Sequence, residues 1–193
     1  KDSFNMVSVD GDTSTNDMVC ILANGLAGNA PIEEAGKDFT AFRKALAKVT
    51  TYLCRKIAKD GEGATKLLEC KVTGAKSKKA ARTVAKSVIQ SSLFKAAMFG
   101  ADANWGRVLC AIGYSGADVD IHKVDLAFKS RAGVLDVCRG GSGIPFSEED
   151  AKRILSEDEI EILISLNDGN ARATAWGCDL TYDYVKINGD YRT

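Results

Sequence analysis

Histidine is almost missing from this 193-residue sequence, in which His122 of "DVDIHKVDL" stands alone. A Ser-His-Asp or Cys-His site would have to use that one residue, and no G-x-S-x-G nucleophile motif is present. The alternation of apolar and polar residues around His122 predicts an ordinary strand or surface position. Acyl-transfer chemistry in this chain would therefore need a base other than histidine.

Net charge is missing as well, because 26 lysines and arginines balance 26 aspartates and glutamates. This balance gives no support to a general nucleic-acid or anionic-membrane partner. The most basic stretch, from Lys71 to Lys95, contains no acidic residue, and Phe94 is its only aromatic. Because it offers no base-stacking platform, we favour the solvated face of a helix over a phosphate-binding surface.

The six cysteines form no C-x-x-C pair, and one histidine leaves no zinc-ligand spacing. Most of them lie in apolar runs such as "MVCILA" and "RVLCAI", which predicts reduced, buried thiols. The sequence also has no run of 18 apolar residues and no signal-peptide pattern. We therefore expect a soluble, cytoplasmic protein without a metal site.

Helical periodicity predicts two long helical stretches and one short helix. Apolar residues recur at steps of three and four over residues 38–59, until "DGEG" at 60–63 ends the helix. The same spacing resumes over residues 77–98. In "SEEDAKRIL", Ser147 stands three residues before Asp150, which is the arrangement of a capping box.

Strand patterns lie between and after these helices. Residues 68–72 alternate between apolar and charged side chains, and short alternating strands are predicted over 119–139. "EIEILISL" and "ATAWGCDLTYDYVKI" are rich in isoleucine, threonine and aromatics and predict two closing strands. Helices and strands do not alternate regularly, so we expect an α+β fold with a sheet packed against helices. It would be one compact unit over residues 1–193, with a subdomain division near 118–145.

Two glycine-rich motifs, "GEGATK" and "RGGSG", lack the spacing of a phosphate-binding loop or a dinucleotide fingerprint and are predicted to be turns. Within the first, Glu62 lies between two glycines where a helix gives way to a strand. A ligand can approach such a loop closely, so the carboxylate is placed to pair with an ammonium group. A plain surface turn is the alternative.

A run of polar residues follows the strand-like start of the chain, in "VSVDGDTSTNDMV" at residues 7–19. Its hydroxyls, carboxylates and carboxamide predict a hydrogen-bonded turn that caps a helix starting near Asn16. A direct catalytic role for Asp10 or Asp12 is the alternative. Further along, "GADANWGR" predicts a glycine-bounded loop, in which Trp105 either anchors the core or lines a pocket.

Taken together, these segments resemble the glutamate N-acetyltransferases of arginine synthesis, also called ornithine acetyltransferases. The stretches that carry the resemblance are "VDGDTSTNDMV", "ANG" at 23–25, "DGEGATK" at 60–66, "GADANWGRVLCAIGYSG" and "ATAWGCDLTYDYVKINGDYRT". They are spread from end to end of the chain. Ala103 stands where the family's G-x-D-P-N-W-G-R pattern has proline, which loosens the loop but removes no reactive group.

The resemblance implies a four-layer α-β-β-α fold assembled from an alpha and a beta chain of one precursor, commonly as two copies of each. In this family the precursor cleaves itself before a threonine, which becomes the nucleophile. The threonine's own α-amino group, with an unperturbed pKa of about 7.7–8.0, can serve as its base. The threonine takes acetyl from N2-acetyl-L-ornithine and passes it to L-glutamate. Some members also use acetyl-CoA as a co-substrate, and no other cofactor is implied.

This chain resembles most of the beta chain without its first turns. The family's threonine lies in an A-T-M-L-like segment, which we expect upstream of Lys1, so no catalytic nucleophile is expected among residues 1–193. Neither Thr13 nor Thr15 matches that segment. The oxyanion donors and a substrate-binding lysine belong to the alpha chain in this family.

Three residues match the substrate-binding positions of the family: Glu62, Asn188 and Thr193. Glu62 would hold the charged amino group of ornithine or its acetylated form, with Glu69 as the fallback if the register differs. Asn188 and Thr193 form the tail pair, and Thr193 also brings the chain's α-carboxylate. Two other functions stay open: a self-processing N-terminal-threonine amidohydrolase or aminopeptidase, and a non-catalytic binding subunit.

Overall fold

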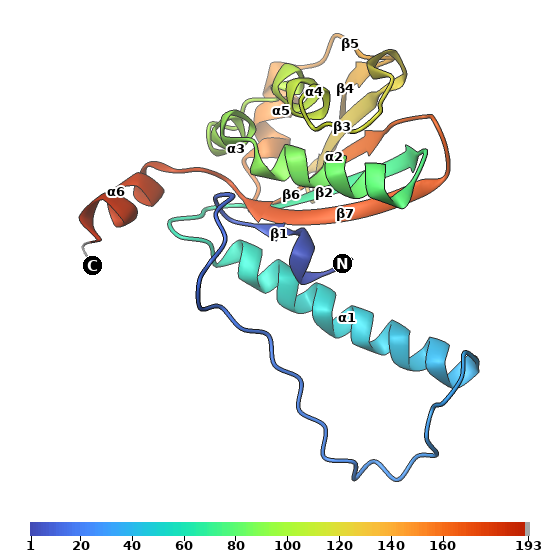
Figure 1. Ribbon diagram of the computed structural model, residues 1–193. Coiled ribbons are helices and arrows are strands. Elements are labelled where there is room, and N and C mark those ends of the chain that lie inside the picture. The colour runs from blue at the N-terminus through green and yellow to red at the C-terminus, as the bar shows by residue number, and fades with distance from the viewer. Residues whose placement is uncertain (192–193) are drawn as a thin grey trace.

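The computed structural model describes residues 1–191 and contains one seven-stranded sheet (Figure 1). In spatial order the strands are β1 (Val7–Ser8), β7 (Ala171–Cys178), β2 (Leu67–Ala75), β6 (Glu159–Ser165), β3 (Asp125–Ser130), β4 (Gly133–Arg139) and β5 (Ser142–Gly143). β1 runs parallel to β7 and β2 parallel to β6, whereas the other neighbours are antiparallel. This mixed sheet confirms the α+β class.

Helices lie on both faces of the sheet (Figure 1). One face is covered by α2 (Lys78–Gln90), α3 (Ser92–Phe99) and α4 (Trp105–Gly113), while α5 (Glu148–Leu155) packs against β3 and β4. The long α1 (Lys37–Lys59) contacts β2 and β7 from the opposite face, and α6 (Tyr182–Asp190) projects beyond the end of β7. Two short 3-10 turns, Phe4–Met6 and Ile121–Lys123, complete the order.

The hydrophobic core lies between the sheet and α2. Val84, Ala85 and Val88 follow the helical period and are fully buried, as the alternating Leu68, Cys70 and Val72 of β2 are. The same alternation sends the charged residues of β2 to the other face, where α1 crosses. The helices predicted over 38–59, 77–98 and in "SEEDAKRIL" are confirmed, although Ser91 divides the second into α2 and α3.

Three predictions of local structure were wrong. The closing strand ends at Cys178, and Tyr182–Asp190 forms α6. Thr181 explains the difference, because its side-chain oxygen accepts the N–H of Tyr184 and caps a helix. No helix begins near Asn16, since residues 9–36 lie in an exposed loop. The "GADANWGR" loop becomes helical from Trp105 onward, because the Asn104 side chain caps α4. The surface position predicted for His122 is confirmed, since this residue lies exposed in a 3-10 turn.

The structure tests the burial predicted for the cysteines and the role of Trp105. Cys54, Cys70, Cys138 and Cys178 are buried, whereas Cys20 and Cys110 are exposed, so the prediction of buried thiols holds for four of six. Trp105 is half-buried and packs against the core, its ring occupying the space that a Cβ on Gly143 would need. It therefore acts as an anchor.

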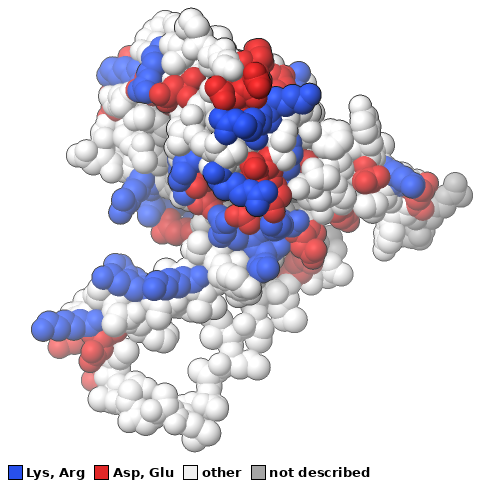
Figure 2. Space-filling model, turned by 180° about the vertical axis from the view of Figure 1, so that it is seen from behind, with Lys and Arg blue, Asp and Glu red and all other residues white. Residues whose placement is uncertain are grey.

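Charged side chains of both signs are interleaved on the surface (Figure 2). On α2, the exposed Lys78 and the partly exposed Arg82 pair with Asp2, which confirms a solvated helix face for this part of the basic stretch, whereas Lys95 in α3 is buried. Strands β3, β4 and β5 continue the same sheet, and the subdomain division near 118–145 stays a prediction.

No helix within residues 1–191 has the length and apolar character needed to cross a bilayer.

Ser147→Ala is expected to lower the free energy of unfolding by about 1 kcal/mol. The Oγ of Ser147 accepts the N–H of Asp150 at 3.1 Å, at the start of α5. Ser156→Ala, at the other end of the same helix, is the matched control, because that end presents carbonyl groups rather than free N–H groups. Urea denaturation measures both variants, and equal losses would contradict the capping role.

Candidate functional site

The candidate site lies where the loop of residues 60–66 meets α6. Asn188 donates a hydrogen bond from Nδ2 to Glu62 Oε2 at 2.6 Å, across 126 positions of sequence. Both side chains are exposed to solvent. The structure thus brings together two of the three predicted substrate-binding residues. The third, Thr193, lies outside the described residues.

Two glycines allow this loop to come so close to the end of β7. A Cβ on Gly61 would lie 2.7 Å from Cys178 Sγ, and one on Gly63 would lie 2.7 Å from the backbone nitrogen of Tyr184. Gly63 also has a φ of +64°, which favours glycine. A plain surface turn needs no such approach, so the geometry favours a loop built to present Glu62 beside α6.

The polar run after β1 reaches the same helix. The hydroxyl of Tyr184 donates to Asp10 Oδ2 at 3.0 Å. Burial first, and then the carboxylates of Asp10, Glu62 and Asp12, raise the pKa of Tyr184 to about 12. This hydroxyl therefore remains a protonated donor at neutral pH. Asp10 binds α6 in the structure, and a direct catalytic role for it or for Asp12 remains untested.

Local hydrogen bonds confirm the turn predicted for "VSVDGDTSTNDMV". Asp10 Oδ1 accepts the N–H of Asp12 at 2.9 Å, and Ser14 Oγ accepts the N–H of Asp17 at 3.3 Å. Short polar side chains commonly satisfy turn backbone in this way. The run therefore shapes the loop that follows β1 and, through Asp10, joins it to α6.

Two buried lysines lie beside this region. Lys95 of α3 is 2% exposed, and its Nζ donates to the Val9 carbonyl and lies 3.8 Å from Cys178 Sγ. Lys66 donates to the Met98 carbonyl at 2.5 Å. Burial lowers the pKa of the Lys66 ammonium, and the negative charge of Asp179 opposes that shift. These contacts join the end of β1, the 60–66 loop and α3 into one body.

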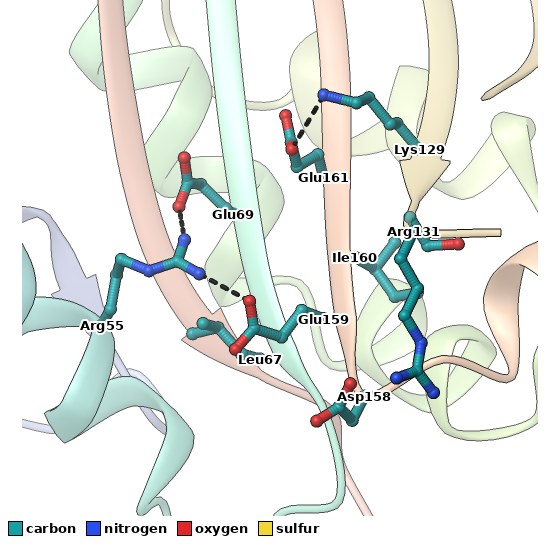
Figure 3. Close-up of a pocket in the computed structure, with 10 residues that line it drawn as sticks. Arg55, Leu67, Glu69, Lys129, Arg131, Asp158, Glu159, Ile160 and Glu161 are labelled. Carbon is teal, nitrogen blue, oxygen red and sulfur yellow. Dashed lines mark hydrogen bonds and ion pairs between the residues drawn. The ribbon is translucent and has the colours of Figure 1, made fainter. Parts of the chain in front are cut away.

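Apart from this region, a hollow of about 460 Å³ is lined by charged residues of β2, β3, β6 and α1 (Figure 3). Its Glu69 accepts hydrogen bonds from Arg55 and from Trp176 Nε1, the latter at 3.0 Å, and pairs with Lys71 at 3.0 Å. Arg55 also binds Glu159 at 2.7 Å. Glu69 is thus engaged in a charge network of the sheet, which favours Glu62 over this fallback as the substrate-binding carboxylate.

Sequence reasoning missed several polar residues around the site, among them Asp179, Thr181 and Tyr184. Their signal is weak, because "CDLTYDYVKI" fits a strand period and a helical period equally well. A threonine directly before the helical residues, followed by the acidic Asp183 in the first turn, is the available sign of a helix cap. Within residues 1–191, no three His, Cys, Asp or Glu side chains gather as metal ligands would.

A carboxylate and a carboxamide thus lie together, open to solvent, at one end of a mixed sheet, and a solvent-open carboxylate has the chemistry to pair with a cationic group. The chain belongs to the ArgJ family, whose model matches residues 1–193. The resemblance inferred from the motifs is thereby confirmed.

Curated relatives match nearly the whole chain. It is 56% identical over 193 residues to the arginine biosynthesis bifunctional protein ArgJ 1 of Clostridium acetobutylicum, covering 100% of this chain and 47% of that protein. It is 53% identical over 192 residues to the ArgJ protein of Thermotoga neapolitana, covering 100% and 48% respectively. The chain therefore spans about half the length of the curated relatives it matches.

A solved structure shares the fold. The crystal structure of the arginine biosynthesis bifunctional protein ArgJ of Bacillus halodurans superposes with a TM-score of 0.92 at 48% identity, covering 98% of this chain and 88% of that one. This match confirms the sheet-and-helix arrangement. The four-layer arrangement completed by a separate alpha chain stays a prediction.

Gly63→Ala is expected to lower the melting temperature by about 5 °C, because the new methyl group meets the first turn of α6 at a positive φ. Gly113→Ala is the control, since a Cβ there meets nothing within 4 Å. Scanning calorimetry compares the two variants. Equal melting temperatures would contradict the close packing of the loop against α6.

Proposed function

We propose that this chain is most of the beta chain of a glutamate N-acetyltransferase (ornithine acetyltransferase) of arginine biosynthesis. The enzyme transfers acetyl from N2-acetyl-L-ornithine to L-glutamate, with acetyl-CoA as an additional donor. The observation that carries the proposal is the exposed Glu62–Asn188 pair, in a chain of the ArgJ family. A carboxylate binds the free ammonium group of acetylornithine through a charge-assisted hydrogen bond.

The covalent step belongs to a threonine that precedes residue 1 in the precursor. Its hydroxyl attacks the acetyl carbonyl, the amide C–N bond breaks, and ornithine leaves with the proton that the hydroxyl gave up. The α-amine of glutamate then attacks the acetyl-threonine ester, which regenerates the hydroxyl and yields N-acetylglutamate. The threonine's α-amino group carries the protons between these steps. Glu62 and Asn188 hold the donor while this happens.

An alpha chain from the same precursor is the proposed partner, in a heterotetramer of two alpha and two beta chains. The apolar side of α1 supports this proposal, because Phe42, Val49 and Leu53 are 59%, 56% and 42% exposed. Met18 and Leu22 in the preceding loop are 85% and 91% exposed. An exposed apolar surface of this extent is typical of an interface with another protein chain. The curated relatives are about twice as long as this chain, which is consistent with an alpha chain from the same precursor, and this chain covers 88% of the solved ArgJ chain.

All six cysteines are free thiols, including the exposed Cys20 and Cys110. Thiols stay in this form under reducing conditions, which supports a cytoplasmic location.

Intact-mass analysis of the protein expressed from its full gene tests self-processing. We expect two fragments, of which the one containing residues 1–193 begins with threonine. Acetyl transfer is then assayed with glutamate as the acceptor. A single uncleaved chain without transfer would overturn the proposal, and a processed enzyme that prefers water to glutamate would be an amidohydrolase instead.

Glu62→Gln in the processed enzyme is expected to raise the KM for N2-acetyl-L-ornithine roughly tenfold or more, since a charge-assisted hydrogen bond contributes about 1.5–3 kcal/mol. Glu69→Gln is the matched control, because the Glu69 carboxylate pairs with Arg55 and Lys71 and accepts a hydrogen bond from Trp176. Steady-state kinetics compares both with the wild type. An unchanged KM in Glu62→Gln, or an equal rise in both variants, would contradict the assignment of Glu62.

A further inference from the structure

The turn between β7 and α6 contains two polar side chains that are almost fully buried. Asp179 is 2% exposed and Thr181 is 5% exposed. Burying a carboxylate is costly unless its oxygens are hydrogen-bonded, so the partners of these side chains define what the turn does. The acetyl-transfer steps described above use neither residue.

Asp179 holds the loop that carries Glu62. Its Oδ1 accepts the backbone N–H groups of Thr65 and Lys66, each at 2.8 Å, and its Oδ2 accepts the hydroxyl of Thr65. The backbone N–H of Asp179 also donates to the Lys66 carbonyl at 3.3 Å. One buried carboxylate thus fixes the end of the loop only three residues after Glu62.

Thr181 connects the same loop to α6. Its hydroxyl donates to the Gly63 carbonyl at 2.7 Å and accepts the N–H of Tyr184 at 3.2 Å. The first contact lies one residue after Glu62, and the second caps the helix that carries Asn188. A single hydroxyl therefore sets the helix against the loop.

Packing alone does not hold α6 in this place. None of its nine residues, Tyr182–Asp190, is buried, and the helix projects from the body of the chain (Figure 1). Its described attachments are the Thr181 cap, the Tyr184–Asp10 bond, the Asn188–Glu62 bond and an edge-to-face contact between Tyr182 and Phe99. A helix with a single aromatic contact and no buried residue takes its orientation mainly from such directional bonds.

We propose that Asp179 and Thr181 are positioning residues, which set Asn188 and Glu62 at the separation that binds the ammonium group of the acetyl donor. This inference rests on the proposed function of that pair. Neither residue touches the substrate. Each acts through the loop backbone or the cap of α6, so its loss changes affinity for a cationic donor rather than the chemistry of acetyl transfer.

Two substitutions of Thr181 in the full-length, self-processed enzyme test this role. Thr181→Val keeps the shape but lacks the hydroxyl, and Thr181→Ser keeps the hydroxyl. We expect Thr181→Val to raise the KM for N2-acetyl-L-ornithine about tenfold. The kcat should stay within about twofold. Thr181→Ser should restore the wild-type KM. Thr73→Val is the matched control, because it removes a threonine bond to a backbone carbonyl, that of Ile164 at 3.2 Å, in β2.

An acetyl donor without an ammonium group separates positioning from general damage. With p-nitrophenyl acetate, Thr181→Val should acylate the enzyme at the wild-type rate. In the Glu62→Gln background, Thr181→Val should add little further increase in KM, because both substitutions disable the same contact. If Thr181→Val does not fold or process, Thr65→Val removes a donor to Asp179 at an exposed position and should show the same increase.

The positioning role is overturned by an unchanged KM in the folded variant, by a KM in Thr181→Ser as high as in Thr181→Val, or by an equal loss with both acetyl donors. A wild-type enzyme that transfers no acetyl at all would instead refute the proposed function. The two failures are therefore distinguishable.

Discussion

The close approach of the 60–66 loop to the end of β7 is the contact on which the rest of the site depends. No side chain fits at Gly61 against Cys178 or at Gly63 against Tyr184, so the loop meets its neighbours backbone first. Contacts made by the backbone itself restrict the position of the loop closely, because each residue of the backbone has only two soft dihedral angles. Glu62 is therefore presented from a rigid support although its side chain is open to solvent.

The strand order explains why distant segments meet at this point. β1 and β7 are parallel, so the polar run after β1 emerges beside the turn after β7. β2 is antiparallel to β7, with Leu67 opposite Cys178, so the loop before β2 arrives at the same end of the sheet. Placing β7 between β1 and β2 thus gathers three separate segments at one end of the sheet. The resulting site is a consequence of topology.

How far the sequence alone predicts this structure depends on the range of the interactions. α1 and α5 follow from local periodicity and from the cap at Ser147, and β2 and β6 follow from alternation. α6 does not, because its sequence suits either period and its cap is decided by contacts with Gly63, far away in the chain. Glu62 and Asn188 were found through the family motifs, whereas Asp179, whose partners lie 113 and 114 residues away, leaves no local signal.

The partners of each carboxylate distinguish the glutamates of the charge network from Glu62, the proposed binding residue. Glu69 and Glu161 pair with lysines of the sheet, and Glu69 also pairs with Arg55 of α1, so their charges are already balanced. Within residues 1–191, Glu62 accepts instead from the neutral amide of Asn188, which orients the carboxylate without cancelling its charge. An oriented, solvent-open negative charge attracts a cation that can displace water from it. Zero net charge is thus compatible with a charged site, because net charge is a sum over the whole chain, whereas the attraction of a cation depends on the charges nearest to it.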